Sequence, residues 1–160
     1  MEDNQNVIDT LNDLIKINND RIEGYEKAIK DSLPDTTNDI LFNQMIEQSN
    51  NIRQELIEEV RRIGGESATD DTTNSGKLYR FWMDVKSTFT GKSESSVLEL
   101  CEFGEDAAQK AYKEALADAE DMADGTRTLI MMQKDQLKES HDLIRTKRDM
   151  YKAIHDAVNN

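Results

Sequence analysis

The sequence predicts an all-α protein built as one four-helix bundle. Three observations support this class. Apolar residues recur at alternating intervals of three and four along four long segments, proline occurs once in 160 residues, and charged residues make up 33% of the chain. Spacing by three and four aligns side chains on one face of a helix, and a high charge suits helices whose outer faces are in water. The length allows one sizeable core but is short for two, so we expect a single domain over residues 1–160.

The first two predicted helices form a hairpin. Residues 4–32 carry an apolar stripe and end before Pro34, because proline disfavours helical geometry at the residue before it. Residues 37–63 form the second helix, which stops at Gly64. The short turn between the two helices makes them antiparallel neighbours.

The last two predicted helices, at residues 94–123 and 126–158, form a second hairpin around Gly125. The connection at 64–93 is much longer, and aromatic residues at helical spacing within it predict a short helix at about 77–87 that packs onto the bundle. Two hairpins joined by one long crossover form the ferritin-like topology.

A carboxylate interrupts the apolar stripe of the third predicted helix. Burying Glu105 costs free energy unless another group pairs with it. The other three stripes also carry polar side chains near their midpoints, namely Asn18, Ser49 and Ser140, and His141 lies beside the last of these. We therefore expect Asn18, Ser49, Glu105 and Ser140 to form a polar layer inside an apolar bundle.

A faint internal repeat connects two members of this layer. The hexapeptide GYEKAI at 24–29 matches AYKEAL at 111–116, which aligns Tyr25 with Tyr112. The same alignment places Asn18 opposite Glu105. The two positions are therefore pseudo-equivalent, with an amide in one half and a carboxylate in the other.

A polar layer in such a bundle raises the question of a metal site. A two-metal carboxylate centre needs a Glu from each of two helices and a Glu-x-x-His pair from each of the others. The chain contains two histidines, His141 and His155, and the residues three positions earlier are Lys138 and Lys152. A complete di-iron or di-manganese centre is therefore not expected.

Two interpretations of the layer remain. In the first, it is a hydrogen-bonded network that holds the helices in register, performs no chemistry and needs no cofactor. In the second, it belongs to a weak mononuclear or degenerate site for iron or manganese, whose candidate ligands are Glu105, His141, Glu102 and Glu47. No phosphate-binding loop or nucleophile motif appears, so the sequence favours a protein that is not an enzyme.

Composition narrows the kinds of binding partner and the cellular location that we expect. The net charge of −13 would repel a nucleic-acid backbone. No apolar run approaches the ~20 residues needed to cross a bilayer, and the acidic start does not resemble a targeting peptide, so we expect a cytoplasmic protein. The one cysteine, Cys101, lies on a helix seam and cannot form an internal disulfide.

Five segments resemble a bacterial four-helix-bundle family of unknown function within the ferritin-like superfamily. They are NNDRIEGYEKA at 18–28, RRIGGE at 61–66, RFWMDVKSTFTG at 80–91, CEFGEDAAQKAYKEAL at 101–116 and SHDLIR at 140–145. The resemblance implies a ferritin-like fold and adds no substrate. Compared with the di-iron members of the superfamily, Glu105 and His141 match ligand positions, whereas Asn18 and Lys138 depart from them.

Two functions follow as expectations. The first is a non-enzymatic bundle that acts by association with itself or with a protein partner, in a stress-related setting. The alternative is a metal-binding ferritin-like protein with a role in metal or oxidative stress.

Overall fold

The computed structural model describes residues 2–31, 36–68, 94–117 and 122–159. These ranges contain four α-helices and no strand: α1 (Glu2–Asp31), α2 (Thr36–Arg62), α4 (Glu94–Ala117) and α5 (Asp124–Asn159). The all-α four-helix bundle predicted from the sequence is confirmed. None of the described helices combines the length and the apolar character that crossing a membrane requires.

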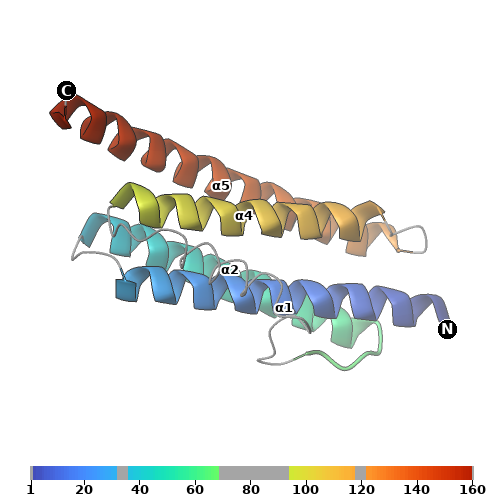
Figure 1. The fold of residues 1–160 in the computed structure, drawn as a ribbon. Coiled ribbons are helices and arrows are strands. Elements are labelled where there is room, and N and C mark those ends of the chain that lie inside the picture. The colour runs from blue at the N-terminus through green and yellow to red at the C-terminus, as the bar shows by residue number, and fades with distance from the viewer. Residues whose placement is uncertain (1, 32–35, 69–93, 118–121, 160) are drawn as a thin grey trace.

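The four helices pack unevenly around the core. α1 packs along α2, α4 packs along α5, and α1 also packs against α4, whereas α2 and α5 meet only over a short region. Figure 1 shows the two helices of each hairpin running in opposite directions. α5 has 36 residues and α4 has 24, and the C-terminal part of α5 extends past the start of α4 and away from the other helices (Figure 1).

The helix ends agree closely with the sequence at most positions. The third helix, which we expected to reach residue 123, is described as far as Ala117, and Met122 and Ala123, the next described residues, are not helical. Residues 118–121 lie outside the described residues, as do 69–93 and with them the short helix expected at 77–87.

Two glycines explain how α2 ends. Gly64 has φ +90°, a conformation that side chains with a Cβ rarely adopt. Its N–H donates to Arg61 O at 3.0 Å and the N–H of Gly65 donates to Val60 O at 2.9 Å, which satisfies two carbonyls of the last helical turn. A Cβ on Gly65 would lie 2.7 Å from Ile8 Cδ1, so glycine also allows the turn to pack against α1.

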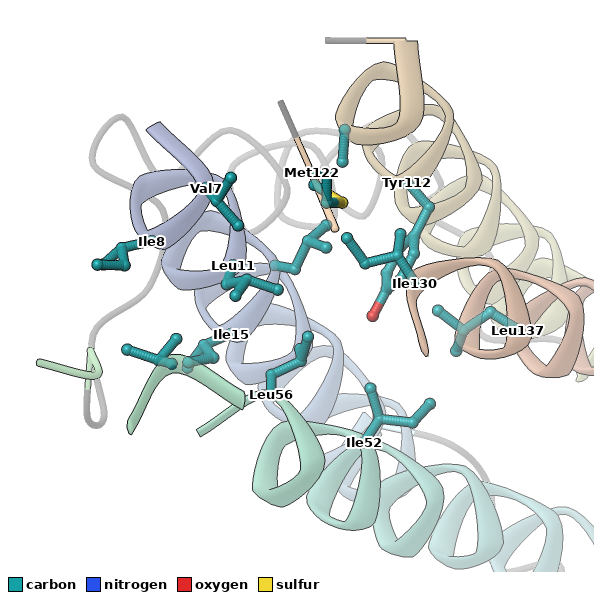
Figure 2. Packing of buried hydrophobic residues seen from close by; sticks show 13 residues of the cluster. Val7, Ile8, Leu11, Ile15, Ile52, Leu56, Tyr112, Met122, Ile130 and Leu137 are labelled. Carbon is teal, nitrogen blue, oxygen red and sulfur yellow. The ribbon is translucent and has the colours of Figure 1, made fainter. Parts of the chain in front are cut away.

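Apolar side chains gather in two clusters. The first cluster includes Leu11, Ile15, Leu56 and Ile130, and Figure 2 shows its side chains meeting between the helices. The second includes Tyr25, Phe42, Leu98 and Ile144. Buried polar side chains lie at the sequence positions between the members of the two clusters, at Asn18 and Arg21 on α1 and at Ser49 on α2.

Candidate functional site

Glu105 lies fully buried in the middle of α4 and is paired with a cation from α1. Arg21 Nε lies 2.7 Å from Glu105 Oε1. Tyr25 lies one helical turn after Arg21, and its hydroxyl donates to the same carboxylate oxygen at 2.5 Å. The side chains of Arg21 and Glu105 are 1% and 0% exposed. A buried carboxylate with a cation and a hydroxyl donor is partly compensated for the loss of water.

The guanidinium of Arg21 also binds α2. Its Nη1 donates to Ser49 Oγ at 2.7 Å and to Met45 O at 3.2 Å. Its Cζ lies 5.2 Å from the centroid of the Tyr25 ring, within the range of a cation–π contact. Arg21 therefore joins α1, α2 and α4 at one level of the bundle.

The network continues from Ser49 to α5. Ser49 Oγ donates to Asn18 Oδ1 at 3.0 Å, and Asn18 Nδ2 donates to the hydroxyl oxygen of Tyr112 at 3.1 Å. The Tyr112 hydroxyl donates to Gln133 Oε1 at 2.9 Å, and Gln133 Nε2 donates to Glu55 Oε1 at 3.2 Å. All four described helices thus contribute to one connected set of polar side chains, which we call the polar layer.

The internal repeat appears in this layer as a reciprocal pair of contacts. Tyr25 of α1 bonds to Glu105 of α4, and Tyr112 of α4 bonds to Asn18 of α1. Because α1 and α4 run in opposite directions, equivalent positions of the two repeats face each other crosswise. One tyrosine meets a carboxylate and the other meets an amide, and the charge of Arg21 lies beside the carboxylate.

Burial and charge set the protonation of the layer. Burial lowers the pKa of Arg21, but Glu105 and Tyr25 raise it by more, so the guanidinium stays charged. Burial, with Glu105 second, holds the pKa of Tyr25 well above its usual range. Burial likewise raises the pKa of Tyr112, so both hydroxyls remain neutral donors at neutral pH. Burial and Glu105 together raise the pKa of Cys101, which keeps this thiol in its protonated, unreactive form.

The position beside Glu105 is therefore already taken by a protein cation. A metal ion bound to Glu105 Oε1 would lie close to the guanidinium of Arg21, which would repel it. Glu105 Oε2 is buried and has no hydrogen-bond partner among the described residues. A metal at Glu105 would thus require Arg21 to move, whereas a network that holds the register of the helices requires no change.

A second group of ionisable side chains lies between α4 and α5. Glu102 and Asp106 are one turn apart on α4, and His141 faces them from α5, so that one ligand atom from each residue lies within 4.8 Å of the others. His141 Nε2 is 2.5 Å from Asp106 Oδ1, and Nδ1 is 3.1 Å from Asp142 Oδ1. The side chain of His141 is 10% exposed and that of Asp106 is 53% exposed. We call Glu102, Asp106 and His141 the His141 cluster.

Two arginines of α5 already pair with the carboxylate of Glu102 in this cluster. Arg145 Nε lies 3.2 Å from Glu102 Oε1, and Arg148 pairs with Glu102 Oε2. Both oxygens of Glu102 are therefore in ion pairs. The donor set fits iron or manganese in chemical type, since carboxylates and imidazole both bind these ions, but a cation here would have to displace two positive charges.

The structure separates the site residues expected from the sequence into different places. It brings Glu102 and His141 together, and leaves Glu105 in the polar layer and Glu47 exposed on α2. Ser140 is buried, but its hydroxyl donates to Gln48 Oε1 at 2.9 Å and does not bond to Asn18 or Ser49 within the described residues.

Sequence reasoning missed members of both places, chiefly Arg21 in the polar layer and Asp106 in the His141 cluster. Arg21 lies three residues after Asn18 and four before Tyr25, which is the spacing of one helix face, and a buried Glu105 needed a cation. These two signals together could have identified it. Asp106 carried no such signal, because an acidic residue beside Glu105 is also what a solvated helix face contains.

The fold also occurs in a solved structure. A mutant form of Dps1 from Mycobacterium smegmatis matches with a TM-score of 0.79 and 13% sequence identity, covering 92% of this chain and 97% of that chain. At this identity the likeness shows the fold, and the ferritin-like class predicted from the sequence is confirmed. A search of curated proteins produced no match.

A family match covers most of the bundle. Residues 6–118 match the family described as "Domain of unknown function (DUF2383)". The matched range includes Arg21, Tyr25, Ser49, Glu105 and Tyr112, which form the larger part of the polar layer, and ends before α5. Because the match covers more than half of the chain, this protein belongs to the DUF2383 family and has the ferritin-like fold.

Proposed function

We propose that this protein acts by association with another protein surface and performs no catalysis. The observation that carries the proposal is a line of exposed apolar side chains on the C-terminal half of α5. Leu143, Met150, Ile154 and Val158 are 43%, 52%, 58% and 78% exposed. They are separated by seven, four and four residues, which places them along one side of the helix. We call these four residues the α5 apolar line.

An exposed apolar line favours binding because it is costly to leave in water. The surface of this chain is otherwise rich in charge, with 33% charged residues overall. Neighbouring apolar side chains on such a surface are typical of sites where a second molecule removes them from water. The line begins beside α4, where Arg145 and Arg148 pair with Glu102, and runs toward the C-terminal end of α5, which extends past the start of α4 (Figure 1).

The interior of the bundle supports the same proposal. Arg21 and Tyr25 already bind Glu105 Oε1, and Tyr112 is held between Asn18 and Gln133. These contacts account for the polar layer as a device that holds four helices in register. The cytoplasmic location and the link to stress remain predictions from the sequence.

Site-specific photocrosslinking tests the proposal. A photoreactive amino acid replaces Ile154 in cells that naturally make the protein, and the matched control replaces Met131, which is 50% exposed but lies on a different side of α5. We expect discrete adducts from position 154 and few from position 131. Equal labelling from both positions, or none from 154, would contradict the proposal.

The His141 cluster supports a second candidate function, the binding of iron or manganese. Here one imidazole and two carboxylates are gathered at one place. Metal content after expression with added iron or manganese tests it, with His141→Ala as the variant and Glu47→Ala as the control. Stoichiometric metal that is lost in His141→Ala and retained in Glu47→Ala is the result expected from this function. Trace metal that is equal in all three proteins rejects it.

A further inference from the structure

Among the described residues, the face formed by α2 and α5 is the least closely packed side of the bundle. These helices meet only over a short region, and a groove of about 420 Å³ lies between them. Glu55 and Glu58 of α2 and Gln136 of α5 are among the residues that line it, and the described lining residues include no Lys or Arg. Ile52 is the apolar member of the lining. The groove is therefore lined mainly by acidic and amide side chains.

The α5 apolar line lies on the same face as this groove. Gln136 precedes Leu143 by seven residues and Met150 by fourteen, so all three project from one side of α5. Met132, one turn before Gln136, is on this side as well and is 58% exposed. One end of the α2/α5 face is thus the acidic groove, and the other end is the apolar line.

Charge differs between the two ends. Residues 143–158 contain four basic side chains, Arg145, Lys147, Arg148 and Lys152, and two acidic ones, Asp149 and Asp156, for a net charge of +2. Arg145 and Arg148 already pair with Glu102 of α4, and Lys152 follows Leu143 by nine residues, which places it on the opposite side of α5. Lys147, four residues after Leu143, is on the side of the apolar line, so it is the basic side chain that this end of the face offers to the acidic groove.

We propose that two copies of this chain associate through their α2/α5 faces about a twofold axis, with the α5 helices antiparallel. This inference rests on the proposed function and identifies its partner as a second copy. The apolar end of each copy then covers the groove of the other, so both complementary contacts form at once. A twofold arrangement closes on itself and stops at two copies.

The sequence positions define the register of this pairing. Placing Met150 of one copy opposite Gln136 of the other sets the twofold axis at Leu143. Ile154 then lies opposite Met132, so two exposed apolar side chains meet on each side of the axis. This register covers all but the last member of the apolar line, and brings Lys147 near the acidic end of the partner's face.

Hydrodynamic measurements test the association. Sedimentation equilibrium of the purified protein is expected to give twice 18.3 kDa, with weaker association at high salt because part of the contact is electrostatic. Ile154→Glu buries one carboxylate at each of two equivalent places and is expected to weaken the dimer about 100-fold. Met131→Glu is the matched control and leaves the dimer unchanged. A strict monomer at all concentrations would overturn the inference.

Disulfide trapping tests the register. Leu143→Cys is expected to cross-link to its own copy, because it lies at the twofold axis. Met132→Cys and Ile154→Cys are each expected to form dimers without a covalent cross-link under oxidation when alone, and to cross-link when mixed. Cys101 is buried and does not compete. A dimer in which Leu143→Cys fails to cross-link, or in which the mixture behaves like the single variants, overturns the proposed pairing.

These results separate the inference from the proposed function. If the photocrosslink at position 154 yields an adduct whose mass differs from twice the chain, and the purified protein is a monomer, the partner is a different protein. The proposed function then survives and the inference of a second copy fails.

Discussion

The polar layer and the His141 cluster both pair a carboxylate of α4 with cations from another helix, and they differ in burial. Glu105 and Arg21 are 0% and 1% exposed, whereas Arg145 is 55% exposed and Arg148 is 25% exposed in their pairs with Glu102. The carboxylates are only three residues apart. Because Arg145 and Arg148 reach the solvent, their pairs with Glu102 are screened more than the buried pair of Arg21 with Glu105, and we expect them to contribute less to stability.

The first way to break this comparison is to remove the buried cation. Arg21→Met leaves Glu105 buried without its charge partner and is expected to lower the free energy of unfolding by about 3–5 kcal/mol. Urea unfolding followed by circular dichroism measures it. The double variant Arg21→Met with Glu105→Leu removes both charges, and we expect it to be more stable than Arg21→Met alone. A cost below about 1 kcal/mol for the single variant would mean that the pair has little structural value.

The second change removes one hydrogen bond and keeps the ion pair. Tyr25→Phe deletes the hydroxyl that donates to Glu105 Oε1, which is a bond to a charged group. We expect a loss of about 1.5–3 kcal/mol of unfolding free energy, measured by urea titration. If the effects of Tyr25→Phe and Arg21→Met on the free energy of unfolding simply add in the double variant, the two residues do not act through a shared network.

The third prediction concerns pH, because two phenols of the polar layer have raised pKa values. The pKa values of Tyr25 and Tyr112 are raised above 10.0, with burial as the main cause. The stability that the two buried, neutral phenols contribute is fully present below the pKa of the unfolded tyrosine. It is lost as the pH rises from that value toward the folded pKa, because only the unfolded phenol ionises there. Each phenol contributes up to about 1.4 kcal/mol per pH unit in this window.

Unfolding at pH 9 and at pH 11 measures this effect. The wild type is expected to lose more stability than Tyr25→Phe or Tyr112→Phe over this interval. If the Phe variants lost as much stability as the wild type, the phenols would not be protected in the folded state.

The smallest effect is expected in the His141 cluster. Asp106→Asn removes the charge of a carboxylate that is 53% exposed beside His141, and should lower the free energy of unfolding by only about 0.5–1 kcal/mol. Thermal or urea unfolding at neutral pH measures it. A loss as large as that of Arg21→Met would show that the two regions do not differ as burial suggests.

The two regions also differ in how well they could be predicted. The stripe positions of Asn18, Ser49 and Glu105 follow from helical spacing alone, and the structure buries all three. The contact of Arg21 with Glu105 joins residues 84 positions apart, and depends on how far α1 slides along α4. Sequence spacing within a helix contains no information on that shift, so the partner of Glu105 was not identified.

Which residues make up the His141 cluster depended even more on the arrangement of the helices. The proximity of Glu102 to His141 was expected, but with Glu105 and Glu47 as the other members of the site. The structure instead turns Asp106 toward His141 and Arg148 toward Glu102. Which of several neighbouring carboxylates faces the next helix is set by the rotation of α4 about its own axis, and a difference of one residue changes it by about 100°.

The sequence by itself determined the four helices, the single crossover and the presence of polar side chains on an apolar seam, because these depend on the spacing of residues within one helix. Tertiary structure decided which cation neutralises Glu105, which residues surround His141, and that α2 and α5 pack together only over a short region within the described part of the chain. These features depend on the axial shift and the rotation of one helix against another, which packing of the whole core determines.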